Sequence, residues 1–356
     1  MRDHLAPSSP GLSRRPRSGG QCRASLSEAT GTSPVATTWL AFALALVALV
    51  CATPTLAQQF PSKMIRIVSP APPGGSTDIV ARLVQPGLQD DLKQTVIVEA
   101  RGGAGGYIGS EYVTKAPADG YTLLVGGAFA AITATLQKNP SYSPRRDLVP
   151  VAILASVPNI LVAGPRLKDN TVAELIADAR ARPGAINIGS NGVGTTLHLS
   201  GELFKLQAGI RLEHIAYRGW ADCVAALTTG EIDMMFDNLS TAYPNVAAGK
   251  TRALAVAATT RHRTLPQVPT LAESGVANAE VMSWFGIMVR ADTPQPVIDR
   301  LSQSLKGISE TAEFRKLVAD QGMDVTFYGA AEAGKFWIAE IDKWEGVIKA
   351  AGIVAQ

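Results

Sequence analysis

Hydrophobic positions beyond residue 57 fall into two kinds of segment. Short runs rich in Val and Ile alternate with longer segments in which apolar residues recur every three or four positions. This alternation predicts an α/β fold with mainly parallel sheets. The expected strands are Ile65–Val68, Val96–Val98, Tyr121–Val125, Val151–Leu154, Ile186–Ile188, Ile232–Phe236 and Leu254–Ala257.

The clearest helical pattern lies in the middle of the chain. Apolar side chains at 172, 175, 176 and 179 share one face of a helix, which Thr171 would cap and Pro183-Gly184 would end. The same spacing predicts two C-terminal helices, around residues 297–305 and 336–348.

The first 57 residues form a different kind of segment. A basic stretch at 14–17 precedes the uninterrupted apolar run Trp39–Val50, and Thr55-Leu56-Ala57 fits a signal-peptidase site. Twelve apolar residues span about 18 Å as a helix, whereas the hydrocarbon core of a bilayer is about 30 Å thick. The pattern therefore predicts a secretory leader, 1–57, cleaved after Ala57, and a periplasmic mature chain.

Two variants of this leader stay open. Arg14-Arg15 resembles part of a twin-arginine signal, and Cys51 stands where a lipoprotein would be modified. The arginine pair lies far from the apolar run, and the bulky Val50 precedes Cys51. Neither variant fits the sequence well, and the choice between the general secretory and the twin-arginine route stays open.

Composition changes the picture in two respects. The chain has 356 residues, 46% of them hydrophobic, which is enough for two domains with separate cores. Five of its 33 Lys and Arg and two of its 30 Asp and Glu lie in the leader, so the mature chain is close to neutral and no nucleic-acid partner is expected. Cys223 is its only cysteine, which excludes an internal disulfide.

A glycine loop follows the first expected strand, at Pro70–Asp78, and leads into a helical segment. Backbone N–H groups in such a turn, beside the positive end of a helix dipole, suit a bound anion. The alternative is an ordinary turn in which Ser76 or Thr77 caps the helix.

A second glycine loop follows the strand at 186–188 and runs from Gly189 to His198. It has the glycine spacing of a nucleotide-binding P-loop, but Thr195 stands where that motif needs lysine, so nucleotide binding is not expected. His198 has no motif partner and is interpreted as a packed histidine rather than a base or ligand contact.

Other motifs do not predict chemistry. Gly103–Gly109 departs from the dinucleotide fingerprint by one residue of spacing. Asp233 lies in the expected strand Ile232–Phe236 and Asp237 follows it directly, with no cluster of His or Cys around them, and hydrolase motifs are absent. We therefore expect no metal, no cofactor and no catalytic residue.

The ordered series PPGGSTD, GGAGG, ADGYTLL, GTTLHLSGELF, AYRG and DMMFDN resembles the Bug family, the periplasmic substrate-binding receptors of tripartite tricarboxylate transporters. The likeness extends from Gln58 to Gln356. It implies a two-lobed, type II periplasmic-binding-protein-like fold with a ligand cleft between the lobes. Lobe 1 would comprise 58–157 and 284–356, and lobe 2 would comprise 158–283.

The resemblance also implies which residues bind ligand. In the family the two glycine loops hold a carboxylate through backbone amides, hydroxyls and waters. Arg218 is a less certain neighbour of the site. The residues carried over are Gly74, Gly75, Ser76 and Asp78 in the first loop, Gly194, Thr195 and Thr196 in the second, and Tyr217 and Asp237 nearby.

Two departures from the family pattern bear on the ligand. Phe129 and Trp220 replace more polar or smaller residues and are expected to form an apolar wall. Such a wall favours an aromatic or long aliphatic carboxylate.

The expected function is capture of a small carboxylate and its delivery to the membrane permease subunits of a tripartite transporter, without catalysis and as a monomer. Two alternatives stay open. One is a secreted α/β enzyme acting on a carboxylate or phosphate ester, and the other is a periplasmic sensor that presents its ligand to a receptor.

Overall fold

The computed structural model describes residues 60–350 and 352–353. The predicted leader, with its cleavage site, lies outside the described residues. Residues 58–356 form one compact unit, and the description below concerns that unit. Within it, no helix combines the length and the apolar character needed to cross a bilayer.

A ten-stranded mixed sheet runs through the described residues, in the order β2-β1-β3-β9-β4-β7-β5-β6, with β8 and β10 paired to β4. The strands are β1 (Ile65–Ser69), β2 (Val96–Ala100), β3 (Thr122–Gly126), β4 (Leu148–Ala163), β5 (Asn187–Ser190), β6 (Glu213–Ala216), β7 (Met234–Asn238), β8 (Arg252–Val256), β9 (Met282–Arg290) and β10 (Asp324–Gly329).

The α/β, two-lobed prediction is confirmed, but the sheet is mixed where mainly parallel pairing was expected. Strands β1, β2 and β3 are parallel to one another, as are β5, β6 and β7. Strand β9 is antiparallel to β3, and β4 is antiparallel to β7, β8, β9 and β10. The difference arises because β4 and β9 cross between two parallel halves in opposite directions.

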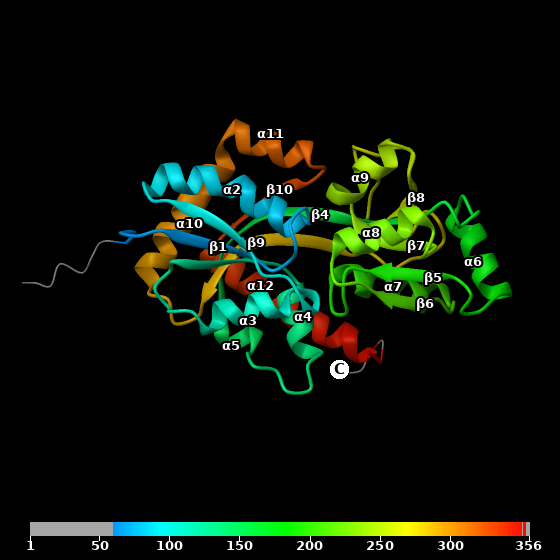
Figure 1. The fold of residues 1–356 in the computed structure, drawn as a ribbon, viewed down its shortest axis with the longest axis horizontal. Helices are drawn as coiled ribbons and strands as arrows, with labels where there is room; N and C mark the ends of the chain where they lie inside the picture. Colours follow the sequence, from blue (N-terminus) through cyan, green and yellow to red (C-terminus); the bar gives the residue numbers. More distant parts are fainter. Residues whose placement is uncertain (1–59, 351, 354–356) are drawn as a thin grey trace, which may run out of the picture. The chain divides into compact units, whose positions relative to one another are not determined.

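The strand β4 is 16 residues long, whereas the sequence predicts only Val151–Leu154. It pairs with β9 as far as Pro158 and with β7 from Asn159 onward. Figure 1 shows β4 and β9 running together from one group of helices to the other. This change of partner lies beside the expected lobe boundary. We keep 58–157 plus 284–356 and 158–283 as the proposed lobes.

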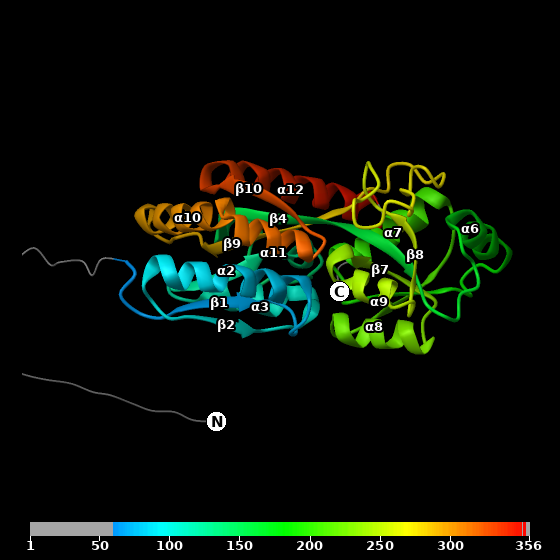
Figure 2. The ribbon, with the colours of Figure 1, turned by 90° about the horizontal axis from the view of Figure 1, so that it is seen from above.

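Helices cover both halves of the sheet. Figures 1 and 2 show α2, α3, α10 and α11 around the β1–β2–β3 half, and α6, α7, α8 and α9 around the β5–β6–β7 half. The bounds are α2 (Ser76–Leu92), α3 (Tyr107–Lys115), α4 (Phe129–Thr135), α5 (Pro144–Asp147), α6 (Val172–Ala181), α7 (Thr196–Ala208), α8 (Trp220–Thr229), α9 (Leu239–Ala247), α10 (Gln295–Glu310), α11 (Ala312–Asp320) and α12 (Ala330–Ala350).

The predicted helix at 172–179 is confirmed as α6. Thr171 accepts a hydrogen bond from the backbone N–H of Glu174, whose side chain in turn accepts from the N–H of Thr171. This capping box fixes the start of the helix. Helices α10 and α12 contain the two C-terminal segments in which the sequence predicts helix.

Candidate ligand-binding site

The first glycine loop joins β1 to α2, as predicted. Asp78, in the first turn of α2, accepts the backbone N–H of Gly74 at 3.1 Å and the Nε–H of Arg82 at 2.9 Å. A carboxylate in the first turn also interacts favourably with the positive end of the helix dipole. Asp78 therefore stabilises the loop without lining the cavity, whereas Ser76 lines it.

The second glycine loop joins β5 to α7. Thr195 caps α7 by accepting the backbone N–H of His198 at 3.2 Å, and its hydroxyl donates to the carbonyl of Gly192 at 2.9 Å. The loop thus has a defined shape before any ligand binds.

Between the two loops lies a cavity of about 70 Å³, measured as the space open to the centres of water-sized spheres. One water needs about 10–15 Å³ by this measure, so the cavity has room for several waters or a small organic ion. Among the residues lining it, Arg218 and Asp237 alone carry charge. The others are Pro70, Ala71, Pro72, Gly75, Ser76, Thr77, Gly103, Gly105, Gly106, Phe129, Asn191, Thr195, Thr196, Leu197, Gly219, Trp220, Asn238, Thr241 and Phe285.

Seven of the predicted site residues line this cavity, and they come from both proposed lobes. They are Gly75, Ser76, Phe129, Thr195, Thr196, Trp220 and Asp237.

Four predicted residues do not line the main cavity. Gly74 and Asp78 hold the first loop through their own hydrogen bond. Gly194 donates its backbone N–H to His198 Nδ1 at 3.3 Å. Tyr217 donates its hydroxyl to Glu231 at 3.1 Å and lines an adjoining cavity. A direct ligand contact for these four remains a prediction.

Sequence reasoning missed several lining residues. Asn238 and Thr241 follow Asp237 at the end of β7, and a signal was available because β7 is parallel to β5, so the carboxyl ends of both strands meet at one edge. Phe285 lies in β9, a strand that the hydrophobic pattern did not predict; the family resemblance places a lobe crossing at residue 284 but did not mark Phe285 as a site residue.

Hydrogen bonds join the two proposed lobes at the cavity. Asn238 Nδ2 donates to Ser76 Oγ at 2.8 Å, and Ser76 Oγ and Ser240 Oγ share a hydrogen bond of 3.1 Å. The lobes also touch elsewhere, because a Cβ built at Gly105, in the turn before α3, would lie only 2.5 Å from the carbonyl oxygen of Val193 in the second glycine loop. The structure therefore describes a closed cleft.

Asp237 is wholly buried at the cavity. Burial raises its pKa to about 6, although hydrogen bonds from Thr241, Trp220 and the backbone N–H of Asn238 act in the opposite direction. The Trp220 indole donates to Oδ2 at 3.0 Å. This bond orients the indole ring at the cavity, and a ligand contact for Trp220 stays a prediction.

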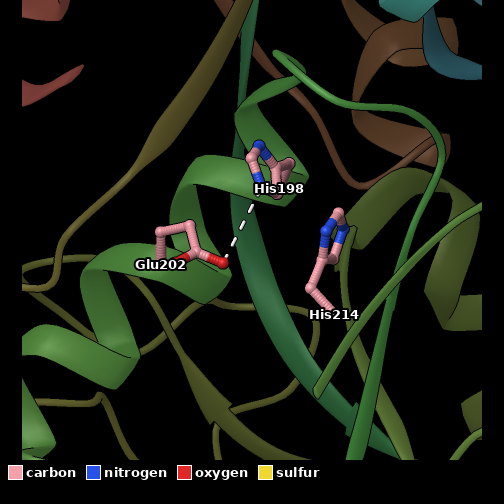
Figure 3. Close-up of side chains that lie close together, drawn as sticks. All are labelled: His198, Glu202 and His214. Carbon is pink, nitrogen blue, oxygen red and sulfur yellow. Dashed lines mark ion pairs between the residues drawn. The ribbon is translucent and has the colours of Figure 1, made fainter. Parts of the chain in front are cut away.

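His198 is a packed histidine, as expected, but it does not stand alone. Figure 3 shows His198 and Glu202 projecting from α7 toward His214 on β6. The two imidazole centroids are 4.3 Å apart, and His198 Nε2 lies 3.7 Å from Glu202 Oε1. Sequence separation hid this cluster, since the two histidines lie on different elements and meet only when β5 and β6 pair.

The cluster supports the second glycine loop. His198 Nδ1 accepts from Gly194, and His214 Nε2 is 2.8 Å from Ser190 Oγ. Burial, together with the neighbouring His214, lowers the pKa of His198 to about 3, so the ring is neutral and can accept that N–H. Neither histidine lines the cavity.

The same three side chains offer ligand atoms within 4.8 Å of one another, a spacing that a metal ion could use. However, Lys205 Nζ is 2.8 Å from both carboxylate oxygens of Glu202. The His198 Nδ1 lone pair is also engaged, and a metal at Nε2 would put a proton on Nδ1. We therefore interpret the cluster as structural.

Residues 80–353 match a family described as "Tripartite tricarboxylate transporter family receptor". Protein BugT of Bordetella pertussis is 35% identical over 303 residues, which cover 85% of this chain and 93% of BugT.

Solved structures agree. Rpa4515 of R. palustris, determined with adipate, is 33% identical with a TM-score of 0.79, covering 83% of this chain and 99% of that one. MatC of Rhodopseudomonas palustris, with bound malate, is 28% identical with a TM-score of 0.77, covering 81% and 100%.

Proposed function

Because the chain belongs to the family of tripartite tricarboxylate transporter receptors, whose members are periplasmic, we propose that it captures a small carboxylate in the cavity between its lobes and delivers it to membrane permease subunits. It does so as a monomer and without catalysis. The leader 1–57 directs export and is removed after Ala57.

The observation that carries this proposal is the position of the Ser76 hydroxyl. It stands at the start of α2 in one lobe and is hydrogen-bonded to Asn238 and Ser240 of the other. A carboxylate placed beside it would meet hydroxyls and backbone N–H groups at the N-termini of α2 and α7, which favour an anion. Closure and anion capture would thus use the same residues.

A receptor role also fits the chemistry of the cavity. Its lining contains no histidine, and its one carboxylate, Asp237, already accepts hydrogen bonds from Trp220, Thr241 and the backbone N–H of Asn238. The alternative of a secreted esterase or phosphatase gains no support from this arrangement.

The ligand class is proposed from two sources. The related structures named above hold adipate and malate, and Phe129, Trp220 and Phe285 give this cavity apolar surface. We propose an aromatic or long aliphatic carboxylate whose carbon chain contacts these rings. Tight binding of citrate or glutamate, with no binding of aromatic acids, would contradict this assignment.

The test is a thermal-shift screen of the purified protein against mono-, di- and tricarboxylates, aromatic acids and phosphate esters. A ligand at about 100 times its Kd adds about 2.7 kcal/mol to the free energy of unfolding, which raises the melting temperature by several degrees. For the carboxylate that stabilises most, Ser76→Ala should weaken binding roughly tenfold, as expected for one lost hydrogen bond to a charged group.

The matched control is Thr229→Ala. Thr229 is exposed on α8, bonds only to carbonyls of its own helix and lines none of the cavities described here. It should keep wild-type affinity. If phosphate esters alone stabilise the protein and are hydrolysed by it, the proposal fails and the enzyme alternative replaces it.

A further inference from the structure

Four side chains form a closed ring of hydrogen bonds where the two crossing strands meet α7. Thr196 Oγ1 and Ser283 Oγ are 2.8 Å apart, and Ser283 Oγ donates to Asn159 Oδ1 at 2.9 Å. Asn159 Nδ2 donates to Ser200 Oγ at 2.8 Å, and Ser200 Oγ donates to the carbonyl of Thr196 at 2.9 Å. The ring therefore begins and ends on Thr196, which lines the main cavity.

Asn159 lies at the point where β4 changes partner. The strand pairs with β9 as far as Pro158 and with β7 from Asn159 onward. Asn159, Ser200 and Ser283 are all buried, and none of the three lines the main cavity. A side chain outside the cavity thus ties the first turn of α7 to both crossing strands.

The ring also determines which atoms donate. A carbonyl oxygen only accepts, so the Ser200 hydroxyl donates to Thr196 and accepts from the Asn159 amide. The Ser283 proton goes to Asn159, so Ser283 Oγ accepts the hydroxyl proton of Thr196. The Thr196 hydroxyl therefore has no proton left for a ligand, and the donors that α7 offers to an anion are its backbone N–H groups.

These N–H groups stabilise an anion only when they point at it, so the orientation of the first turn of α7 decides how much the turn contributes. A buried ring of hydrogen bonds specifies one orientation, because any shift of the turn leaves buried polar atoms without partners.

We propose that Asn159 is a positioning residue for ligand capture. Through the ring it holds the first turn of α7 in the orientation in which its N–H groups face the bound carboxylate. This inference rests on the proposed function and deepens it, since it assigns part of the binding energy to a residue that lies outside the cavity.

The experiment is titration calorimetry of wild type and Asn159→Ala with hexanoate, adipate and benzoate as probes. For the probe that binds wild type most tightly, Asn159→Ala should weaken binding about tenfold, which is the loss of about one hydrogen bond to a charged group. Ser283→Ala, which opens the ring at β9, should weaken binding in the same way. Melting curves establish that each variant is folded, and if Asn159→Ala does not fold, Ser283→Ala decides the test.

The matched control is Ser156→Ala. Ser156 also lies on β4, and its hydroxyl is 2.9 Å from Thr326 Oγ1 of β10. It lies outside the ring and does not line the main cavity. The variant removes a side-chain hydrogen bond from the same crossing strand, so it should lower the melting temperature and leave the affinity unchanged.

A double-mutant cycle separates positioning from a merely structural role. Asn159→Ala and Thr196→Val both open the same ring, so together they should weaken binding by clearly less than the product of their separate factors. Ser156→Ala should add nothing to the loss caused by Thr196→Val.

Unchanged affinity in folded Asn159→Ala and Ser283→Ala would overturn the inference and leave the receptor function intact. Losses that multiply in the cycle would do the same, because Asn159 would then act independently of α7. Failure of all three probes to bind wild type would contradict the proposed function and this inference together. The two failures are therefore distinguishable.

Discussion

Asp237 is a carboxylate placed in a cavity that we propose for carboxylates. Its pKa is raised to about 6 by burial, so it is mostly ionised at pH 7 and mostly protonated at pH 5. An ionised Asp237 repels an anionic ligand, and its protonation removes that repulsion. A bound anion would in turn raise the pKa of Asp237 further.

Ligand affinity should therefore rise as the pH falls from 8 to about 5.5, where small carboxylates are still ionised. If the ligand raises the pKa of Asp237 by one unit, the gain is about tenfold. Titration calorimetry at several pH values measures it. The variant Asp237→Asn should give a flat profile over this range, and a wild-type profile that is flat or falls toward acid would contradict the assignment.

The residue scale also shows what a sequence can reveal about the site. Hydroxyls at strand–loop–helix junctions, such as Ser76, Thr195 and Thr196, are recognisable because that local geometry favours anions. Gly74 and Asp78 lie in the same motif but face each other, because a first-turn carboxylate turns back to accept its own loop's N–H. Spacing alone does not distinguish a residue that faces the ligand from one that holds the loop.

At the scale of elements, the glycine loops decide whether the lobes can close. Gly105 lies in the short turn before α3 with φ of +64° and packs against the carbonyl of Val193 in the other lobe. Gly209, which ends α7, has φ of +61° with no atom near its Cβ position. The two glycines share a backbone conformation and differ in contact across the cleft.

Replacing either glycine by alanine should cost about 1 kcal/mol of stability, since both positions are left-handed. Only Gly105→Ala should weaken ligand binding, by at least about tenfold, or 1.4 kcal/mol, because its methyl group would meet Val193 when the lobes close. Urea unfolding and calorimetry give the two quantities. Equal affinities in the two variants would show that closure does not require this contact.

Strands and helices with a regular pattern of hydrophobic residues were predictable from the sequence, and those without one were not. The parallel strands β1, β2, β3, β5 and β7 and helix α6 follow directly from Val/Ile runs and 3.6-residue periodicity, whereas β6 has no such run and was not predicted. The prediction for β4 was too short because Pro150 and Pro158 lie within the strand, and a proline in a sequence argues against a strand. The structure accommodates Pro150 beside an irregularity in the pairing with β9.

At the scale of the whole molecule, two strands join two α/β halves, and the cavity lies where the carboxyl ends of their parallel strands face each other. Such a linkage permits hinge closure, in which a ligand held by both lobes shifts the population toward the closed form. The fold class follows from alternating sequence patterns, whereas the pairing of His198 with His214 and the contact of Ser76 with Asn238 depend on tertiary structure.

The central claim is that this protein binds a small carboxylate and releases it unchanged. Titration calorimetry with linear and aromatic carboxylates, followed by NMR of the recovered ligand, tests it most directly. We predict saturable binding of at least one such acid at one site per chain, in the micromolar range or tighter, and recovery of the intact ligand. Absence of binding across the whole series, or a recovered ligand that has been chemically converted, would contradict it.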